Sequence, residues 1–109
     1  MRHVASRPVD GKPLTETVFF ILLSLQAGPL HGYGMMKEIA SLSDGRVRLT
    51  TGTLYGAIKR LLDDEWIVEV AAAESSRGSK TYRLTRLGRA QLDAEIRRLR
   101  QLIYAVEAR

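Results

Sequence analysis

Apolar residues recur every three or four positions in the first regular segment of the chain, which starts near residue 15. This period is typical of one face of an α-helix. Thr15 is a suitable N-cap, and Glu16 suits the positive end of the helix, while Gly28 and Pro29 end the segment. The predicted apolar face of this first helix consists of Leu14, Val18, Ile21, Leu22 and Leu25.

Two further helices are predicted between residues 32 and 62. The second helix runs from Gly32 to about Leu42, with an inward face made of Met35, Met36, Ile39 and Ala40. Residues 46–50 are expected to form a short strand, after which Thr51 caps a third helix. The apolar face of this third helix consists of Leu54, Ile58, Leu61 and Leu62. Its opposite face carries small and hydrogen-bonding residues, which are Thr51, Thr53, Tyr55, Gly56 and Lys59.

Two segments of strand character follow, at residues 67–72 and 80–85, on either side of a glycine- and serine-containing turn. They predict an antiparallel hairpin with a basic tip, in which Tyr82 and Leu84 share one face. Residues 86–108 then show apolar positions at alternating spacings of four and three, the pattern of a helix that packs on a partner helix. This seam consists of Leu92, Ile96, Leu99, Ile103 and Val106.

The predicted order of three helices, a hairpin and a last helix defines the fold class. We expect a mainly α-helical protein with a small β-hairpin, arranged as a winged helix-turn-helix with an N-terminal helix and a C-terminal dimerisation helix. The expected organisation is a flexible N-terminal arm at residues 1–13, a winged-helix domain at residues 14–85 and the dimerisation helix at residues 86–109.

Composition narrows the function classes. The 109 residues fit one compact domain, and 17 basic against 12 acidic side chains give a net charge of +5. A basic chain suits a polyanionic partner, although many small proteins are basic for solubility alone. The absence of cysteine excludes disulfides and thiolate chemistry. The apolar run at residues 18–25 is too short for a bilayer, and residues 1–13 lack a secretory signal, so we expect a cytoplasmic protein.

The placement of the charges favours duplex DNA as the partner. The third helix presents residues that can enter a major groove, and Gly56 allows close approach of the backbone. The hairpin places basic side chains and turn amides near phosphates, while Tyr82 either contacts a sugar or packs inward. A solvated helix face is the alternative for the third helix alone. The predicted DNA-binding residues are Thr51, Thr53, Leu54, Tyr55, Lys59, Arg77, Ser79, Lys80 and Tyr82.

Three motifs occur together in this chain. They are His31-Gly32-Tyr33-Gly34, then Thr51-Gly52-Thr53-Leu54-Tyr55 with Ile58-Lys59-Arg60-Leu61, and finally Lys80-Thr81-Tyr82-Arg83-Leu84-Thr85 with Gly88. In order and spacing they resemble the PadR family of transcriptional regulators, from Leu14 to the end of the chain. The single C-terminal helix resembles the short subfamily. Thr51 departs from the proline commonly found there. A hydroxyl rather than a proline ring then caps the third helix, so we expect the helix to form, while its exact contacts with DNA are not specified by the resemblance.

The resemblance implies a winged-helix domain, binding to a palindromic operator, dimerisation through the first and last helices, and repression relieved by a small-molecule effector. The all-round apolar first helix and the terminal seam agree with a homodimer. Any effector pocket would lie between these helices, near Phe19, Phe20, Leu99 and Tyr104, although plain interface packing is the favoured interpretation there. The predicted dimerisation residues are Val18, Phe19, Leu22, Leu92, Ile96, Leu99, Ile103 and Val106.

Catalysis and cofactor binding are not expected. His3 lies in the arm and His31 precedes a helix, and neither has an obvious metal-binding companion. His31 either closes a loop or donates to a phosphate. Gly32-Tyr33-Gly34 lacks the strand and third glycine of a dinucleotide-binding loop. Trp66 is interpreted as a core residue beneath the hairpin. A winged helix that binds protein or structured RNA is the remaining alternative, because the fold alone fixes no function.

Overall fold

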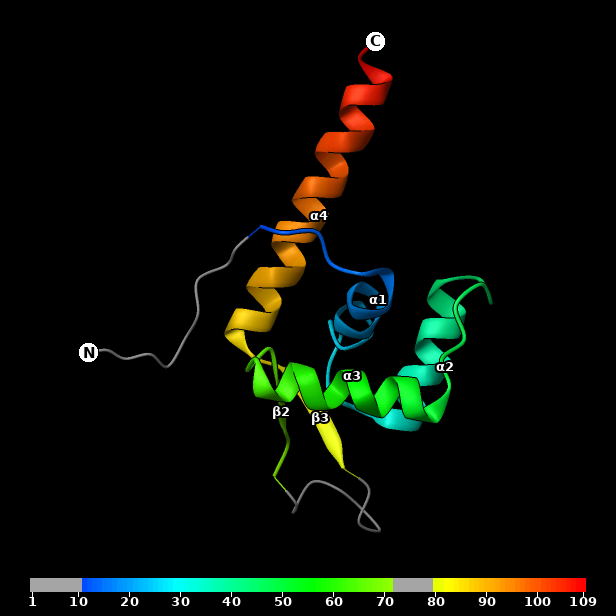
Figure 1. The fold of residues 1–109 in the computed structure, drawn as a ribbon, viewed down its shortest axis with the longest axis vertical. Coiled ribbons are helices and arrows are strands. Elements are labelled where there is room, and N and C mark those ends of the chain that lie inside the picture. The colour runs from blue at the N-terminus through cyan, green and yellow to red at the C-terminus, as the bar shows by residue number, and fades with distance from the viewer. Residues whose placement is uncertain (1–10, 72–79) are drawn as a thin grey trace, which may run out of the picture.

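The computed structural model describes residues 11–71 and 80–109. Its elements follow in the order α1 (Glu16–Ser24), β1 (Leu30–His31), α2 (Gly32–Leu42), α3 (Thr51–Asp63), β2 (Ile67–Glu69), β3 (Thr81–Leu84) and α4 (Arg86–Glu107). Figure 1 shows α1, α2 and α3 gathered beside the first half of α4, while the second half of α4 projects away from them. Apart from the short β1, this order of three helices, two strands and a final helix agrees with the predicted winged helix-turn-helix.

The core is formed by the inward faces of the three short helices, the hairpin strands and the start of α4. Ile21 and Leu22 of α1 meet Met35 and Ile39 of α2 in one cluster. The other buried apolar residues of this cluster are Leu25, Leu54, Ile58, Leu61, Ile67, Tyr82, Leu84 and Leu92. The first turns of α4 therefore belong to the same core as the winged-helix elements.

The sheet has three strands in the order β1-β3-β2, and both pairings are antiparallel. The hairpin pairs Ile67 with Leu84 and Val68 with Arg83, which confirms its predicted direction. β1 was not predicted: Leu30 and His31 pair with Tyr82 and Thr81, respectively. A strand of two residues is too short to show the alternation by which strands are identified in a sequence.

The strand expected at residues 46–50 is wrong. This segment connects α2 to α3 without regular secondary structure. Its alternation is real, since Val47 and Leu49 pack against the core while Arg46, Arg48 and Thr50 are exposed. Alternation indicates only an extended half-buried segment, and a strand also needs a neighbouring strand to which it can hydrogen-bond.

No described helix combines the length and apolar character needed to cross a membrane.

Candidate nucleic-acid interface

The outward face of α3 is the centre of the candidate interface. Its inward residues Leu54, Ile58 and Leu61 are buried, which fixes the rotation of the helix about its axis. The opposite side is consequently exposed to solvent. It carries the predicted residues Thr51, Thr53, Tyr55, Gly56 and Lys59. This face combines hydroxyls, one amine and a stretch of bare backbone, as a helix in the major groove requires.

The N-terminus of α3 is capped one residue earlier than predicted. The Thr53 amide donates to Thr50 Oγ1 over 3.1 Å, and Thr50 Oγ1 lies 3.0 Å from Thr53 Oγ1. Thr50 is therefore the N-cap, and Thr51 is the first helical residue. The sequence has two adjacent threonines, either of which could cap a helix. Because Thr50 takes this role, the exposed Thr51 side chain is left available at the start of α3.

Two predicted DNA-binding side chains, those of Leu54 and Tyr82, are corrected by the structure. Leu54 is fully buried and Tyr82 is only 3% exposed, so neither can contact a base or a phosphate. Both instead position the interface, because Leu54 anchors α3 in the core and Tyr82 anchors β3. Burial raises the pKa of Tyr82, and the nearby Tyr55 and Glu69 raise it further. The expectation that Tyr82 and Leu84 share an inward face is confirmed.

Tyr55 joins α3 to the N-terminus of α2. A Cβ atom placed on Gly32 would lie 2.2 Å from the Tyr55 hydroxyl oxygen. The tyrosine ring therefore rests against the bare Cα of Gly32, while 45% of the Tyr55 surface remains exposed. A side chain at position 32 would therefore displace the Tyr55 ring from its place on the interface.

The N-terminus of α2 adds residues that the prediction left out. His31 is the N-cap, because its Nδ1 accepts a hydrogen bond of 3.1 Å from the Gly34 amide. This role agrees with a histidine that closes a loop. Tyr33 is 67% exposed, and the Lys37 ammonium lies 5.6 Å from the centre of its ring. The spacing of Tyr33 and Lys37 by four residues was the signal in the sequence, since such residues are neighbours on a helix.

Part of the hairpin can be placed. Lys80 and Arg83 are exposed, and Arg83 Nη1 donates to the Leu84 carbonyl oxygen over 3.2 Å. The predicted contacts Arg77 and Ser79 lie outside the described residues. β2 and β3 descend beside α3 in Figure 1, so the base of the hairpin and α3 lie next to one another. Contacts between α3 and β2 agree with this arrangement.

The turn between α2 and α3 is organised by Ser43. The Ser43 hydroxyl accepts a hydrogen bond of 2.9 Å from the Val47 amide. Asp44 and Gly45 have φ angles of 58° and 81°, the left-handed conformation that reverses the chain after α2. The Gly45 amide donates to the Ala40 carbonyl oxygen over 2.7 Å, which closes the end of the helix. These bonds define where α3 begins relative to α2.

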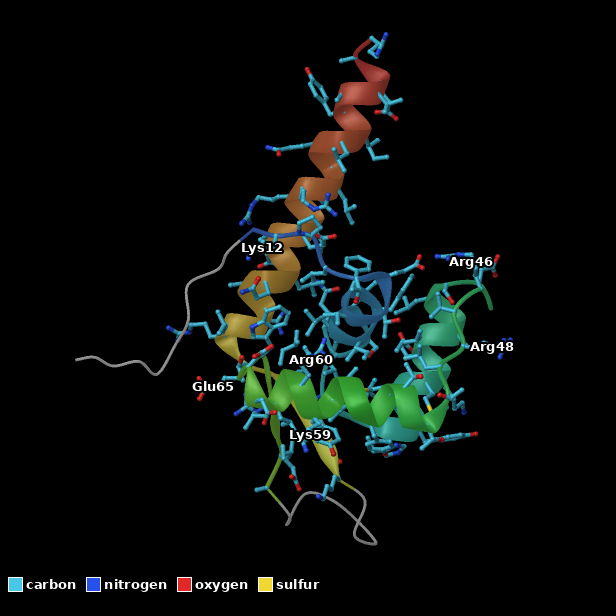
Figure 2. All side chains as sticks on the ribbon, viewed as in Figure 1. Lys12, Arg46, Arg48, Lys59, Arg60 and Glu65 are labelled. Atoms are coloured by element: carbon cyan, nitrogen blue, oxygen red, sulfur yellow. The ribbon has the colours of Figure 1, made fainter. Side chains whose placement is uncertain are left out.

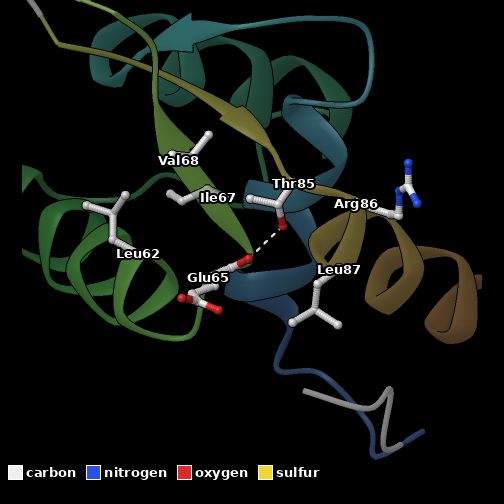
Figure 3. A pocket seen from close by; sticks show the side chains of 7 residues that line it. All are labelled: Leu62, Glu65, Ile67, Val68, Thr85, Arg86 and Leu87. Carbon is white, nitrogen blue, oxygen red and sulfur yellow. Dashed lines mark hydrogen bonds between the residues drawn. The ribbon is translucent and has the colours of Figure 1, made fainter. Parts of the chain in front are cut away.

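The junction between the hairpin and α4 is closed by Thr85. Its hydroxyl donates to the Glu65 carbonyl oxygen over 2.6 Å and accepts from the Gly88 amide over 3.0 Å. Figure 3 shows the hydrogen bond between Thr85 and Glu65 beside a hollow of about 490 Å³. The hollow is lined by Leu62, Glu65, Ile67, Val68, Thr85, Arg86 and Leu87. Trp66 is partly buried and packs against the core, which agrees with its predicted place beneath the hairpin.

The predicted dimerisation residues fall into three groups. Leu22 and Leu92 are fully buried within the chain, so they are corrected to core residues and cannot touch a partner subunit. Val18, Phe19 and Ile96 are partly buried against the core. The remaining three lie exposed on the projecting half of α4, and they are Leu99, Ile103 and Val106.

An open hollow of about 430 Å³ lies along α1 and α4 beside these exposed residues. It is lined by Phe19, Ile96, Leu99, Arg100, Ile103, Tyr104 and Glu107. Three of the four residues named for an effector pocket border this hollow, while Phe20 borders a neighbouring one. Phe19 and Phe20 contact each other edge to face, with ring centres 5.5 Å apart.

Metal ligands do not gather anywhere in the described parts of the chain, where no cluster of three or more His, Asp or Glu side chains could hold an ion. The α3 face offers hydroxyl groups and the amine of Lys59. Such a surface can bind phosphates and base edges.

Comparisons with known proteins identify the family. The model of the transcriptional regulator PadR-like family matches residues 21–94, which is more than half of the chain. The chain belongs to the PadR-like family. This confirms the resemblance carried by the three motifs. PadR-like proteins are regulators of transcription and not enzymes. None of the curated proteins matches the chain significantly.

Solved structures agree with this assignment. A PadR family transcription regulator from Clostridium difficile is 27% identical with a TM-score of 0.67, and the match covers 86% of this chain and 97% of that one. F93 from STIV, a winged-helix DNA-binding protein, has a TM-score of 0.63 at 23% identity, over 87% and 95% of the two chains. Bacillus subtilis PadR, solved with operator DNA, has a TM-score of 0.64 at 23% identity, over 75% of this chain and 46% of PadR. The winged-helix fold of this PadR-like chain is thereby confirmed.

Proposed function

We propose that this PadR-like protein binds an inverted-repeat operator in duplex DNA as a homodimer and represses transcription from it. The observation that carries the proposal is the exposed polar face of α3, which lies beside the hairpin. Membership in a family of transcriptional regulators supports the same function. The fold shared with Bacillus subtilis PadR, which was solved with operator DNA, supports α3 as the reading helix.

The residues of the interface divide into two roles. Thr51, Thr53 and Tyr55 face the base edges from α3, where hydroxyls can donate or accept hydrogen bonds. Lys59 lies further along the same exposed face and contacts a phosphate. Arg77, Ser79 and Lys80 contact the backbone beside the groove from the hairpin. The exposed Lys37 adds a phosphate contact from α2.

The homodimer is proposed to form through α1 and the projecting half of α4. Leu99, Ile103 and Val106 are exposed there although they are apolar, and Phe19 lines the same hollow as Leu99 and Ile103. A second copy that covers these residues would bury them. This interface would place two α3 helices on one duplex, with half-sites about 34–36 Å apart. A small-molecule effector would bind in the hollow between α1 and α4.

DNA titration at two salt concentrations tests the proposal. Wild-type protein is titrated with a duplex selected by that protein from a random-sequence pool, and with an unrelated duplex of equal length. We expect preference for the selected inverted repeat and a steep loss of affinity with salt. Equal affinity for every duplex contradicts the operator. Failure to bind duplex DNA, with binding to structured RNA or a protein instead, supports the alternative use of the fold.

Lys59 and Arg60 provide a matched pair of variants for this titration. Both side chains are exposed on α3 and carry one positive charge, and Figure 2 shows them on different sides of the helix. We expect Lys59→Ala to weaken DNA binding and to lower the salt slope by about 1, because it removes one phosphate contact. Arg60→Ala is expected to have the smaller effect. Equal losses would show that only the overall charge matters.

A further inference from the structure

We propose that Glu16 and Arg46 are positioning residues for DNA reading, because their ion pair ties the turn before α3 to the start of α1. The inference rests on the proposed function, since it concerns how the α3 face is held on DNA. Neither residue lies on that face. The pair would act by setting the position of α3 relative to the rest of the core.

The ion pair joins two segments that are 30 residues apart in the sequence. Arg46 Nη1 donates to Glu16 Oε1 over 3.2 Å, and Arg46 Nη2 donates to Glu16 Oε2. Both oxygens and both terminal nitrogens are used, which is the two-pronged geometry that orients an arginine on a carboxylate. The pairing lowers the pKa of Glu16 and raises that of Arg46. The pair therefore specifies a direction as well as a distance between α1 and the turn.

The other hydrogen bonds of the turn are local, so the ion pair adds a tie to a distant element beside the packing of Val47 and Leu49 on the core. Ser43 bonds to Val47, and the Arg46 amide donates to the Ser43 carbonyl oxygen over 3.1 Å. These bonds fix the shape of the turn and attach it to α2. Within residues 43–50, all of which the structure describes, Arg46 is the residue that makes a hydrogen bond to α1. Thr50, which caps α3, follows only four residues later, so displacement of Arg46 is passed on to the start of the recognition helix.

The position of Arg46 argues against a direct contact between this side chain and the DNA. Figure 2 shows Arg46 at the end of α2 remote from α3, while Lys59 projects from the side of α3 that faces away from α1. An arginine placed there does not reach a duplex that lies against the α3 face. Its effect on DNA binding would thus pass through the protein and not through a phosphate.

Neutralising Glu16 distinguishes an effect of net charge from a positioning effect, because the two predict opposite changes in DNA affinity. Glu16→Gln removes one negative charge, which by electrostatics alone strengthens binding to a polyanion. If the pair positions α3, the same variant weakens binding to the selected duplex by roughly two- to five-fold, as expected for loss of an exposed ion pair. Glu38→Gln is the matched control, because Glu38 is also exposed and lies on α2, and it is expected to leave binding unchanged or slightly tighter.

The experiment measures affinity for the duplex selected by wild-type protein and for an unrelated duplex, at one salt concentration. Circular dichroism melting confirms that each variant is folded. We expect Glu16→Gln to weaken only binding to the selected duplex, since non-specific binding depends on charge. Unchanged or tighter binding of Glu16→Gln to the selected duplex, as in the Glu38→Gln control, overturns the inference.

A charge swap completes the test. Arg46→Glu alone places two carboxylates together and is expected to weaken binding to the selected duplex. The double variant Glu16→Arg with Arg46→Glu restores the pair at unchanged net charge, and we expect affinity within about two-fold of wild type. If the folded double variant stays as weak as Arg46→Glu, Arg46 acts directly on DNA and the positioning role is wrong. Failure of wild-type protein to select any duplex overturns the proposed function itself, before any variant is compared.

Discussion

At the scale of single residues, two glycines in helices have opposite surroundings. A Cβ atom on Gly88 would lie 1.9 Å from the Trp66 carbonyl oxygen, a contact with backbone that no rotamer change can relieve. A Cβ atom on Gly56 would meet nothing within 4 Å. Packing within the chain therefore requires the glycine at 88 and does not require the one at 56. The open space beside Gly56 agrees with the proposed close approach of a duplex to α3.

Gly56→Ala is accordingly expected to raise stability and lower DNA affinity. Alanine in the interior of a helix is more favourable than glycine by roughly 0.5–1 kcal/mol, which should raise the melting temperature by a few degrees. The added methyl group would hold the backbone of α3 away from the base edges and weaken binding to the selected duplex by about tenfold. Thermal melting and titration measure the two effects. Unchanged DNA affinity would show that the duplex does not approach this face closely.

Gly88→Ala should instead destabilise the fold. The methyl group must push α4 away from Trp66, which lies between α3 and β2, and overpacking of this kind costs about 1–3 kcal/mol. Chemical denaturation followed by circular dichroism measures the change in the free energy of unfolding. Ala90→Gly, two residues along the same helix, serves as a control for the propensity difference alone. A loss no larger than that of the control would mean that the junction adapts freely.

Single residues also show where the sequence was informative. Thr15 was predicted as the cap of α1, and the Val18 amide does donate to its hydroxyl. The helical period already places Leu54 on the inward face of α3. Its prediction as a DNA contact followed the Gly52-Thr53-Leu54-Tyr55 motif instead, and that prediction was wrong. Tyr82 was left open, and only tertiary packing decides that it faces inward. No local pattern connects Glu16 with Arg46, because their contact exists only once the helices have packed.

At the scale of elements, the contact of α1 with α4 contains a buried charge. Glu95 is only 4% exposed, and its carboxylate accepts hydrogen bonds from Arg98 at 2.9 Å and 2.7 Å. These bonds lower the pKa of Glu95 more than burial raises it, and the Leu14 backbone amide lowers it further. The carboxylate thus ties α4 to the residues that lead into α1.

Glu95→Gln should lower stability at neutral pH by roughly 1–2 kcal/mol. Because the folded state depresses the pKa of Glu95, the stability that this group contributes is present above its unfolded pKa. It is lost as the pH falls from about 5 through the lower folded pKa. The difference between wild type and Glu95→Gln should therefore shrink over this acidic range. Denaturation at several pH values measures it, with exposed Asp93→Asn as control, and a constant difference would contradict the assignment.

The elements were predicted with uneven success. α2 and α4 were placed to within a residue, because their apolar positions recur over several turns and their ends carry clear caps. The segment at residues 46–50 shows the same alternation as a strand but has no strand to pair with. β1 exists only because Leu30 and His31 lie beside β3. Pairing between distant segments is the information that periodicity does not contain.

At the scale of the whole molecule, α4 extends well beyond the core that it helps to form. Figure 1 shows its second half projecting alone, and apolar side chains remain exposed along it. They are Leu99, Leu102, Ile103, Tyr104 and Val106. The four-and-three spacing of the seam predicted this helix, but it did not distinguish Leu92, which the chain buries itself, from Ile103, which it leaves exposed. That distinction depends on where the core ends.

The projecting half of α4 allows the proposed dimer to be tested separately from folding. Ile103 is 57% exposed, so Ile103→Asp should leave the melting of the winged-helix core nearly unchanged while placing a charge in the apolar face between subunits. Sedimentation at micromolar concentration should then detect a monomer, whereas we expect a dimer for the wild-type protein. A monomer binds one half-site at a time, so the affinity for the full inverted repeat should fall by about 10²-fold.

Affinity for a duplex that contains a single half-site should stay the same, because the α3 face is untouched. Gln101→Asp introduces the same charge at another exposed position of this helix and should leave the dimer intact. If Ile103→Asp remains dimeric, the subunits meet elsewhere and the role of α4 as the dimerisation helix is wrong. If it is monomeric but binds the full repeat as tightly as before, one chain alone reads the operator.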